Sequence, residues 1–421
     1  MVGVILFLKE TFYSRSMRTR LIALAIIFLS STLVAPSADA AVRDGALCSK
    51  VGSITKVNSY QFRCVKTGKK VTWQRIVDQI SSKQDVFYRL NNGVLERRAF
   101  TGTFHKSDSR SPKDFSPIRA KAFEEMNKLV KNPATPNIEL NFDLRDGFPT
   151  EIREYNLKKI RESFAVWSTF IESPIKVKVL LATEKDLSYI RKQGDLFSDS
   201  IGAIDRLAQV DLTRENVWIT GSAGYVQYNG ELIGKIFLGT RSEAKTDRYN
   251  PEWMQVAAHE AFHVVQDFWM AGTRHDSQQA YQTRRPQHYT EGGANFVGYS
   301  LSSNNIGWYS DAMDVSLNRY WNFVRGWKPA KSNNDIVQLL IATEISDSEQ
   351  AFELSYPLGA LFYEWIVGTY GAAKFIEMGR QTKNNAKFDD TIKKVFGVSK
   401  NDLYAKAAPY ILSVFKRNGL S

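Results

Sequence analysis

The string His259-Glu260-Ala261-Phe262-His263 lies in a run that is free of glycine and proline from Glu252 to Met270. This run follows Pro251 and predicts a helix, because proline is tolerated in a first helical turn. On a helix the two histidines lie one turn apart on the same face, which is the spacing of two zinc ligands, and Glu260 is placed to act as general base. Most neighbouring residues are apolar, so the helix is expected to be buried. A buried helix has little reason to carry these three polar side chains unless something satisfies them.

A third zinc ligand is expected at Glu291, 28 residues after the second histidine, in the string Thr290-Glu291-Gly292-Gly293-Ala294. Thr290 is expected to cap a following helix and to place the glutamate in its first turn, and the two glycines to allow close packing against the motif helix. An acidic residue at such a position also occurs for electrostatic reasons alone. The alternative ligands are His275 and His288, each of which needs a loop that folds back. The prediction is one zinc ion, bound by both motif histidines and by Glu291.

Composition indicates a globular protein of more than one domain. The chain has 421 residues, of which 43% are hydrophobic, 12% aromatic and 24% charged, which is ample for a sizeable core. The net charge is +12, and because residues 1–40 hold four basic and two acidic side chains, the remainder carries +12 − 2 = +10. This charge favours contact with an anionic cell-wall polymer or membrane surface, although it also serves solubility. No nucleic-acid-binding pattern is present, and no such partner is expected.

Residues 1–40 are predicted to be a signal peptide. Three arginines between residues 15 and 20 precede an apolar run from Leu21 to Val34, and Ala38-Asp39-Ala40 offers small residues for cleavage. The run is shorter than the roughly 20 residues of a membrane span. An uncleaved anchor is the alternative, and Met17 is an alternative start, since the signal is complete from there onward. We therefore expect a secreted or cell-surface protein.

The two cysteines, Cys48 and Cys64, are expected to form a disulfide, as an even count at short separation suggests in an exported chain. From Cys48 to Arg75 there are seven Lys or Arg residues and no Asp or Glu. With Trp73, these residues resemble the small Cys-Cys-Trp modules beside the signal peptides of secreted bacterial proteins. Residues 41–78 are therefore predicted to form a small disulfide-stapled basic module. It acts either in wall or polyanion attachment or as a passive spacer.

The rest of the chain predicts an α+β architecture. Residues 79–134 are expected to be a helical or linker segment, and residues 135–421 the catalytic domain. Alternating or apolar runs predict strands at 138–142, 175–181, 217–219 and 233–238, and helical periodicity predicts a helix over 151–171. After residue 251 the pattern is mainly helical. A small mixed or antiparallel sheet is thus followed by a mainly helical half that carries the zinc motif.

The motif and the downstream residues resemble the gluzincin metallopeptidases, the group that contains thermolysin and aminopeptidase N. The string from Ser355 to Phe362 is similar to the Tyr-x-x-Gly segment of the aminopeptidase N branch, and residues 388–403 resemble the helical tail of peptidase-MA-like proteins. The resemblance covers roughly residues 135–415. It implies a gluzincin-like fold, peptide or protein substrates, and a role for Tyr356 in stabilising the oxyanion. A buried aromatic residue at a helix start is the plainer reading of Tyr356.

The resemblance has one departure. The aminopeptidases carry a Gly-x-Met-Glu-Asn string that holds the free amino terminus of the substrate, whereas residues 221–226 read Gly-Ser-Ala-Gly-Tyr-Val. Aminopeptidase specificity therefore does not follow from the resemblance, and the strand at 233–238 could instead be the edge on which an extended peptide pairs. The sequence thus predicts a secreted zinc peptidase. The alternative is a non-catalytic cell-surface or wall-binding protein that retains the fold.

Overall fold

The structure is a computed structural model that describes residues 47–57, 60–67, 70–75, 86–91, 94–99, 110–131, 138–171, 175–193, 196–208, 219–244, 251–270, 285–323, 329–345, 348–382 and 386–421. The predicted signal peptide and His275 lie outside these residues. The chain divides into two compact units, one within residues 12–84 and one from Asp85 to Ser421.

The N-terminal unit is a three-stranded antiparallel sheet. Its strands β1 (Ile54–Val57), β2 (Tyr60–Thr67) and β3 (Lys70–Arg75) follow each other in sequence order. Cys64 on β2 lies opposite Trp73 on β3 and forms the predicted disulfide with Cys48. The backbone N–H of Cys48 also donates to the carbonyl of Val71, 3.1 Å away. The segment before β1 is therefore bound both to β2 and to β3.

The second unit contains the remaining elements. Its strands, among the described residues, are β4 (Val86–Asn91), β5 (Val94–Ala99), β6 (Ile138–Leu144), β7 (Ile175–Thr183), β8 (Ile219–Tyr228) and β9 (Glu231–Thr240). Its helices are α2 (Pro117–Lys131), α3 (Thr150–Trp167), α4 (Leu187–Lys192), α5 (Ile201–Leu207), α6 (Pro251–Trp269), α8 (Gly293–Ser302), α9 (Ile306–Phe323), α10 (Asn333–Ala342), α11 (Glu349–Tyr370), α12 (Ala372–Gln381), α13 (Phe388–Phe396) and α14 (Lys400–Arg417). Strands β4 and β5 form a separate hairpin.

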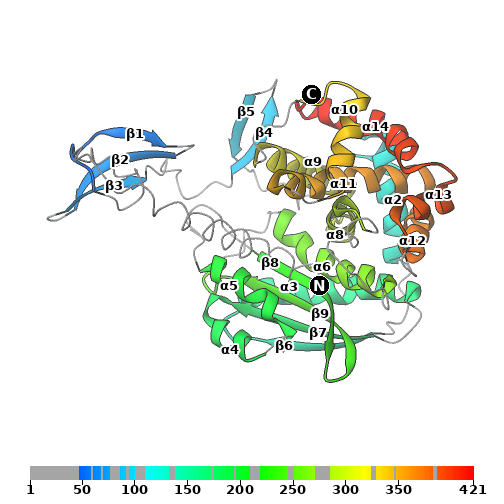
Figure 1. The fold of residues 1–421 in the computed structure, drawn as a ribbon, viewed down its shortest axis with the longest axis horizontal. Coiled ribbons are helices and arrows are strands. Elements are labelled where there is room, and N and C mark those ends of the chain that lie inside the picture. Colours follow the sequence, from blue (N-terminus) through cyan, green and yellow to red (C-terminus); the bar gives the residue numbers. More distant parts are fainter. Residues whose placement is uncertain are drawn as a thin grey trace, which may run out of the picture. The chain divides into compact units, whose positions relative to one another are not determined.

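A four-stranded mixed sheet has the order β6-β7-β9-β8. Strands β6, β7 and β9 are parallel, and β8 pairs antiparallel with β9. The side chains of β7 alternate between two cores: Val177 and Val179 pack in the large core with α3 and α6, whereas Leu180 and Ala182 pack against residues of α4 and α5. Figure 1 shows α3 and α6 lying against this sheet. Helices therefore cover both faces, as parallel strands require.

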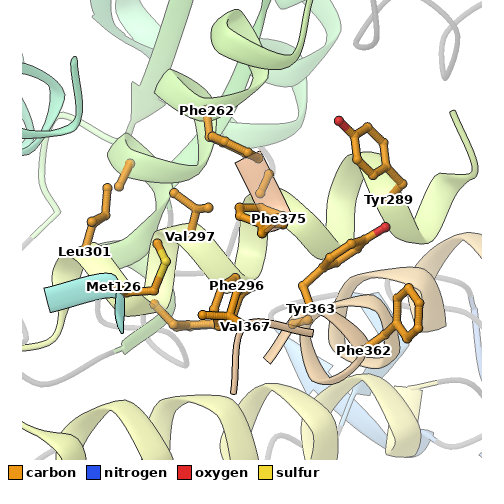
Figure 2. Close-up of a cluster of buried hydrophobic side chains, with 14 of the residues drawn as sticks. Met126, Phe262, Tyr289, Phe296, Val297, Leu301, Phe362, Tyr363, Val367 and Phe375 are labelled. Atoms are coloured by element: carbon orange, nitrogen blue, oxygen red, sulfur yellow. The ribbon is translucent and has the colours of Figure 1, made fainter. Parts of the chain in front are cut away.

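Helix α6 lies close to the sheet because Gly234 on β9 has no side chain. A Cβ atom there would be 2.9 Å from Cγ1 of Val264. The opposite side of α6 joins the helical half through an aromatic cluster around Phe375 of α12 (Figure 2). The ring centroids of Phe262, Phe296 and Tyr363 lie 5.7, 5.9 and 5.5 Å from that of Phe375. This cluster fixes α6, α8 and α11 relative to one another.

Helix α2 belongs to the same core. Its Arg119 is only 1% exposed, and its guanidinium bonds Glu364 of α11 at 2.8 Å and Asp314 of α9 at 2.8 Å. The hydroxyl of Tyr410 on α14 donates to the same glutamate. Burial opposes the charge on Arg119, but the two carboxylates outweigh it, so the pKa of Arg119 lies well above its ordinary value. The compact unit that carries the motif thus extends N-terminal to residue 135.

The predicted α+β class is confirmed: a small mixed sheet precedes a mainly helical half. The expected helix after Pro251 and the expected strands that begin at Ile138 and Ile175 are also present. Within the described ranges, no helix has the length and apolar character needed to cross a membrane.

Candidate metal centre

The two motif histidines lie on one face of α6, as their spacing predicts. Both are buried, and their Nε2 atoms are 2.9 Å apart. Two nitrogens this close, each on a ring anchored to the same rigid helix, form one half of a candidate metal centre.

Glu291 completes the cluster. It lies in a π-helical turn, His288–Gly292 (η7), that leads directly into α8. Its Oε2 atom is 3.4 Å from Nε2 of His259 and 3.2 Å from Nε2 of His263. The three candidate ligand atoms lie within 4.8 Å of one another, and no other such group of three occurs in the described part of the chain. Two imidazole nitrogens and one carboxylate oxygen are a donor set that suits a catalytic zinc ion.

The electrostatic environment keeps Glu291 ionised. Burial by itself raises the pKa of this carboxyl group, but the neighbouring His263 and His259 outweigh burial and hold the pKa well below its ordinary value. The amide of Gln287 also donates to Oε1 of Glu291 at 3.3 Å. An ionised, buried carboxylate beside two imidazoles is what a divalent cation requires of its ligands.

Two amide side chains hold the histidine rings, and sequence reasoning missed both. Nδ1 of His259 is 2.9 Å from Oδ1 of Asn295, and Nδ1 of His263 is 2.9 Å from Oε1 of Gln266. With Nδ1 donating, each ring keeps the lone pair of Nε2 for a ligand. The signal was present in the spacing: Asn295 follows Glu291 by four residues, and Gln266 follows His263 by three.

Glu260 lies against the backbone of β8. Its side chain is buried, and a Cβ atom on Gly221 would lie only 2.6 Å from its Cδ and Cγ atoms. Glycine at position 221 therefore lets the carboxylate approach the strand. The general-base candidate thus lies against β8, an outer strand of the sheet.

The strand at 233–238 is not an edge strand, so that prediction was wrong: the outer strands of the described sheet are β6 and β8. The run 233–238 lies in β9, between β7 and β8. The turn Asn229–Gly230, with φ angles of 50° and 82°, returns the chain as a tight hairpin, and β8 takes the outer position. Sequence patterns indicated only residues 217–219 here, because two glycines interrupt the apolar pattern of β8.

One outward-facing group of β8 is already engaged. Tyr228 and Glu231 flank the turn and form a hydrogen-bonded pair. Alternate residues of β8, beginning with the one just before Tyr228, therefore direct their N–H groups away from β9. The N–H of Tyr225 donates to Oδ2 of Asp267 on α6, 3.3 Å away. Asp267 in turn pairs with Arg285. Burial raises the pKa of Asp267, but Arg285 overcomes this and lowers it below its ordinary value.

Tyr356 lies beside the histidine pair. It is on α11, and its ring stacks with that of His259 at a centroid distance of 6.1 Å and an interplanar angle of 7°. Gly359, one turn later, touches η7: a Cβ atom there would overlap the carbonyl oxygen of His288 and lie 2.8 Å from Cα of Gly292. The Tyr-x-x-Gly spacing thus places the tyrosine at the cluster by bringing the two backbones together.

Two local expectations need correction. Thr290 does not cap a helix: it lies inside η7, and its hydroxyl donates to the carbonyl of Pro286. Gly292 packs against α11, and only Gly293 faces α6, where a Cβ atom would be 3.3 Å from Nε2 of Gln266. The alternative ligand His288 is not in the cluster, because its Nε2 is 2.6 Å from the hydroxyl of Tyr404. The other alternative, His275, lies outside the described residues.

Comparison with known protein families, curated proteins and solved structures gave no match.

Proposed function

We propose that this chain is an exported, zinc-dependent peptidase of the gluzincin type. The observation that carries the proposal is the convergence of His259, His263 and Glu291, with the second nitrogen of each imidazole bound by an amide oxygen. A purely structural cluster has no need for two imidazoles that both direct Nε2 at one carboxylate in a buried site. A zinc ligand set does.

The residues around the cluster suit hydrolysis of an amide bond. Zinc, when bound, supplies a Lewis acid that polarises a carbonyl group and makes water acidic near neutral pH. Glu260 accepts a proton from the attacking water while the oxygen of that water bonds to the carbonyl carbon. When the C–N bond breaks, Glu260 passes the proton to the leaving amine. The hydroxyl of Tyr356 donates a hydrogen bond to the oxygen that becomes negative in the transition state.

The substrate class follows from the neighbouring strand. A peptide in extended conformation can add to the outer edge of β8, where Gly221 lies beside Glu260. Backbone pairing of this kind is largely independent of side chains, so it suits peptides and unfolded proteins. Residues 221–226 lack the amino-terminus anchor of the aminopeptidases, which argues for cleavage within a chain.

The test compares wild-type chain with the E260Q variant, and E231Q serves as a matched control because Glu231 pairs with Lys176 on the surface. We expect one equivalent of zinc in all three proteins by elemental mass spectrometry. Chelator-sensitive cleavage of a mixed protein substrate should be present in wild type and E231Q, and should fall at least about 1,000-fold in E260Q, since the general base is lost.

The other outcomes decide between the alternatives. Full activity in E260Q contradicts the proposed mechanism. Zinc without turnover in the wild-type chain favours the non-catalytic surface protein, and absence of zinc after purification without chelators contradicts the metal centre itself.

A further inference from the structure

The side chain of Gln266 contacts both halves of the candidate metal centre. Its Oε1 atom is 2.9 Å from Nδ1 of His263. Its Nε2 atom donates to the backbone carbonyls of Tyr289 and Thr290, at 3.1 and 3.2 Å. These carbonyls belong to η7, immediately before Glu291. One buried amide therefore links a candidate ligand on α6 to the segment that presents another.

The chemistry of these neighbours allows only one orientation of the amide. Carbonyl oxygens accept hydrogen bonds and cannot donate them, so the NH2 group of Gln266 must face η7. On the opposite side, Nη2 of Arg285 donates to Oε1 at 3.4 Å, which holds the oxygen towards His263. Because this oxygen only accepts, Nδ1 of His263 must carry the proton. Nε2 of His263 then keeps its lone pair for a metal ion.

We infer that Gln266 is a positioning residue that sets the protonated nitrogen of His263 and the location of Glu291 through a single amide group. The inference rests on the proposed function, because that function gives His263 and Glu291 a common role as zinc ligands. It predicts that the NH2 group, and not only the oxygen, is needed for tight zinc binding. Loss of the NH2 group releases η7, and with it the glutamate, from α6.

Asn295 offers a matched comparison within the same site. Its Oδ1 accepts from Nδ1 of His259, but its buried Nδ2 has no hydrogen-bond partner among the residues that the structure describes. Replacing either amide by a carboxylate keeps the acceptor oxygen and adds one negative charge beside the centre. The two replacements differ in the hydrogen bonds that the lost NH2 group makes in the wild-type protein. In Gln266→Glu it was bound to two carbonyls, and in Asn295→Asp to none.

The experiment measures zinc affinity of the full chain by competition with a chromophoric chelator, for wild type, Q266E, N295D and Q266M. We expect Q266E to bind zinc about 10- to 100-fold more weakly, because a carboxylate oxygen repels the carbonyls of η7. N295D should bind zinc at least as tightly as wild type, since a carboxylate is a stronger acceptor for Nδ1–H. Q266M has the same length without polar atoms and should also lose affinity.

Visible absorption of the cobalt(II)-substituted proteins provides a second readout, since it responds to coordination geometry. The spectrum should change in Q266E and stay near that of wild type in N295D. Circular dichroism of the metal-free proteins separates loss of binding from loss of folding, and Q266M replaces Q266E if the charged variant does not fold. Equal zinc affinity in Q266E, Q266M and wild type overturns the inference while the proposed function stands. Absence of zinc from the wild-type chain overturns both.

Discussion

At the scale of the residue, His288 shows how a buried histidine near the candidate metal centre can serve the fold alone. It is 0% exposed, and its ring lies among Phe362, Phe388 and Tyr404. Burial, assisted by the positive charge of Lys400, lowers the pKa of His288 from 6.5 to about 3. The neutral ring accepts the hydrogen bond from the Tyr404 hydroxyl, which a protonated ring could not do.

This depressed pKa makes stability depend on pH. Above pH 6.5 His288 is neutral in both the folded and the unfolded chain, so the full stability is present. As the pH falls from 6.5 towards about 3, only the unfolded chain takes up the proton, and stability is lost. Between pH 7 and pH 5 this loss is about 2 kcal/mol for one histidine.

The measurement is urea unfolding of wild type and H288Q at pH 7 and pH 5. We expect the wild-type free energy of unfolding to fall by about 2 kcal/mol more than that of H288Q over this interval. H288Q can be less stable at both pH values, since Tyr404 loses its partner, but the comparison depends only on the change with pH. Equal changes in the two proteins would contradict the buried, neutral state of His288.

At the scale of the element, the crossing of η7 with α11 determines whether Tyr356 and Glu291 face the same site. The crossing requires glycine on both sides, at positions 292 and 359. We expect G359A to unfold at a lower temperature and to bind zinc more weakly, because its Cβ atom would overlap the carbonyl of His288 and push α11 away from η7. Overpacking of this kind costs about 1–3 kcal/mol.

Calorimetry and zinc titration of G359A test this expectation. A matched control is G397A, where a Cβ atom would meet nothing within 4 Å but where φ is +72°. The control should lose about 1 kcal/mol from backbone strain alone, with unchanged zinc affinity. Wild-type zinc affinity in G359A would show that the crossing does not position the site.

The elements that the sequence predicted are those whose pattern is periodic and uninterrupted. Helix α6 and strand β7 are of this kind, and the two candidate ligands on α6 follow from helical geometry. Strand β8 was largely missed because Gly221 and Gly224 carry no apolar side chain, yet glycine at 221 is what admits Glu260. The π-helical turn was missed because threonine is a common N-cap residue, so Thr290 was expected to cap a helix. The features that the sequence did not reveal thus lie where the backbone is in close contact with a neighbouring segment, because such contacts leave no periodic pattern of side chains.

The role of α2 was hidden for a different reason. A helix with an arginine near its start looks solvent-exposed in sequence, because unpaired arginine is seldom buried. The partners of Arg119, Asp314 and Glu364, follow about 195 and 245 residues later, so no local pattern connects them. Such long-range ion pairs cannot be read from one sequence.

At the scale of the whole molecule, the two compact units predict different responses to truncation. A chain that begins at Asp85 retains every described element of the second unit, and we expect it to fold and to bind one equivalent of zinc. A chain that begins at residue 135 loses α2 and leaves Glu364 buried without Arg119. Removing one partner of a buried pair costs about 3–5 kcal/mol, so this shorter chain should be largely unfolded.

Circular dichroism, thermal unfolding and zinc content of the two truncated chains provide the test. Reduction of the disulfide in the full chain is a useful control, because Cys48 and Cys64 both lie in the N-terminal unit and zinc binding should be unaffected. A folded, zinc-binding chain from residue 135 onward would refute the structural role of α2.

In the proposed mode of peptide binding, the hydrogen bond from Tyr225 to Asp267 would limit how long a peptide can run along β8. Towards the hairpin turn, Gly221 and Ala223 direct their N–H and C=O groups outward, and the next outward N–H is already bound by the carboxylate. A guest strand can therefore form about four ladder hydrogen bonds on this side before it must leave the sheet. Beyond that point it faces a charged pair, Asp267 and Arg285. In the proposed mode of binding, the same carboxylate that steadies α6 against the sheet would thus stop the incoming peptide.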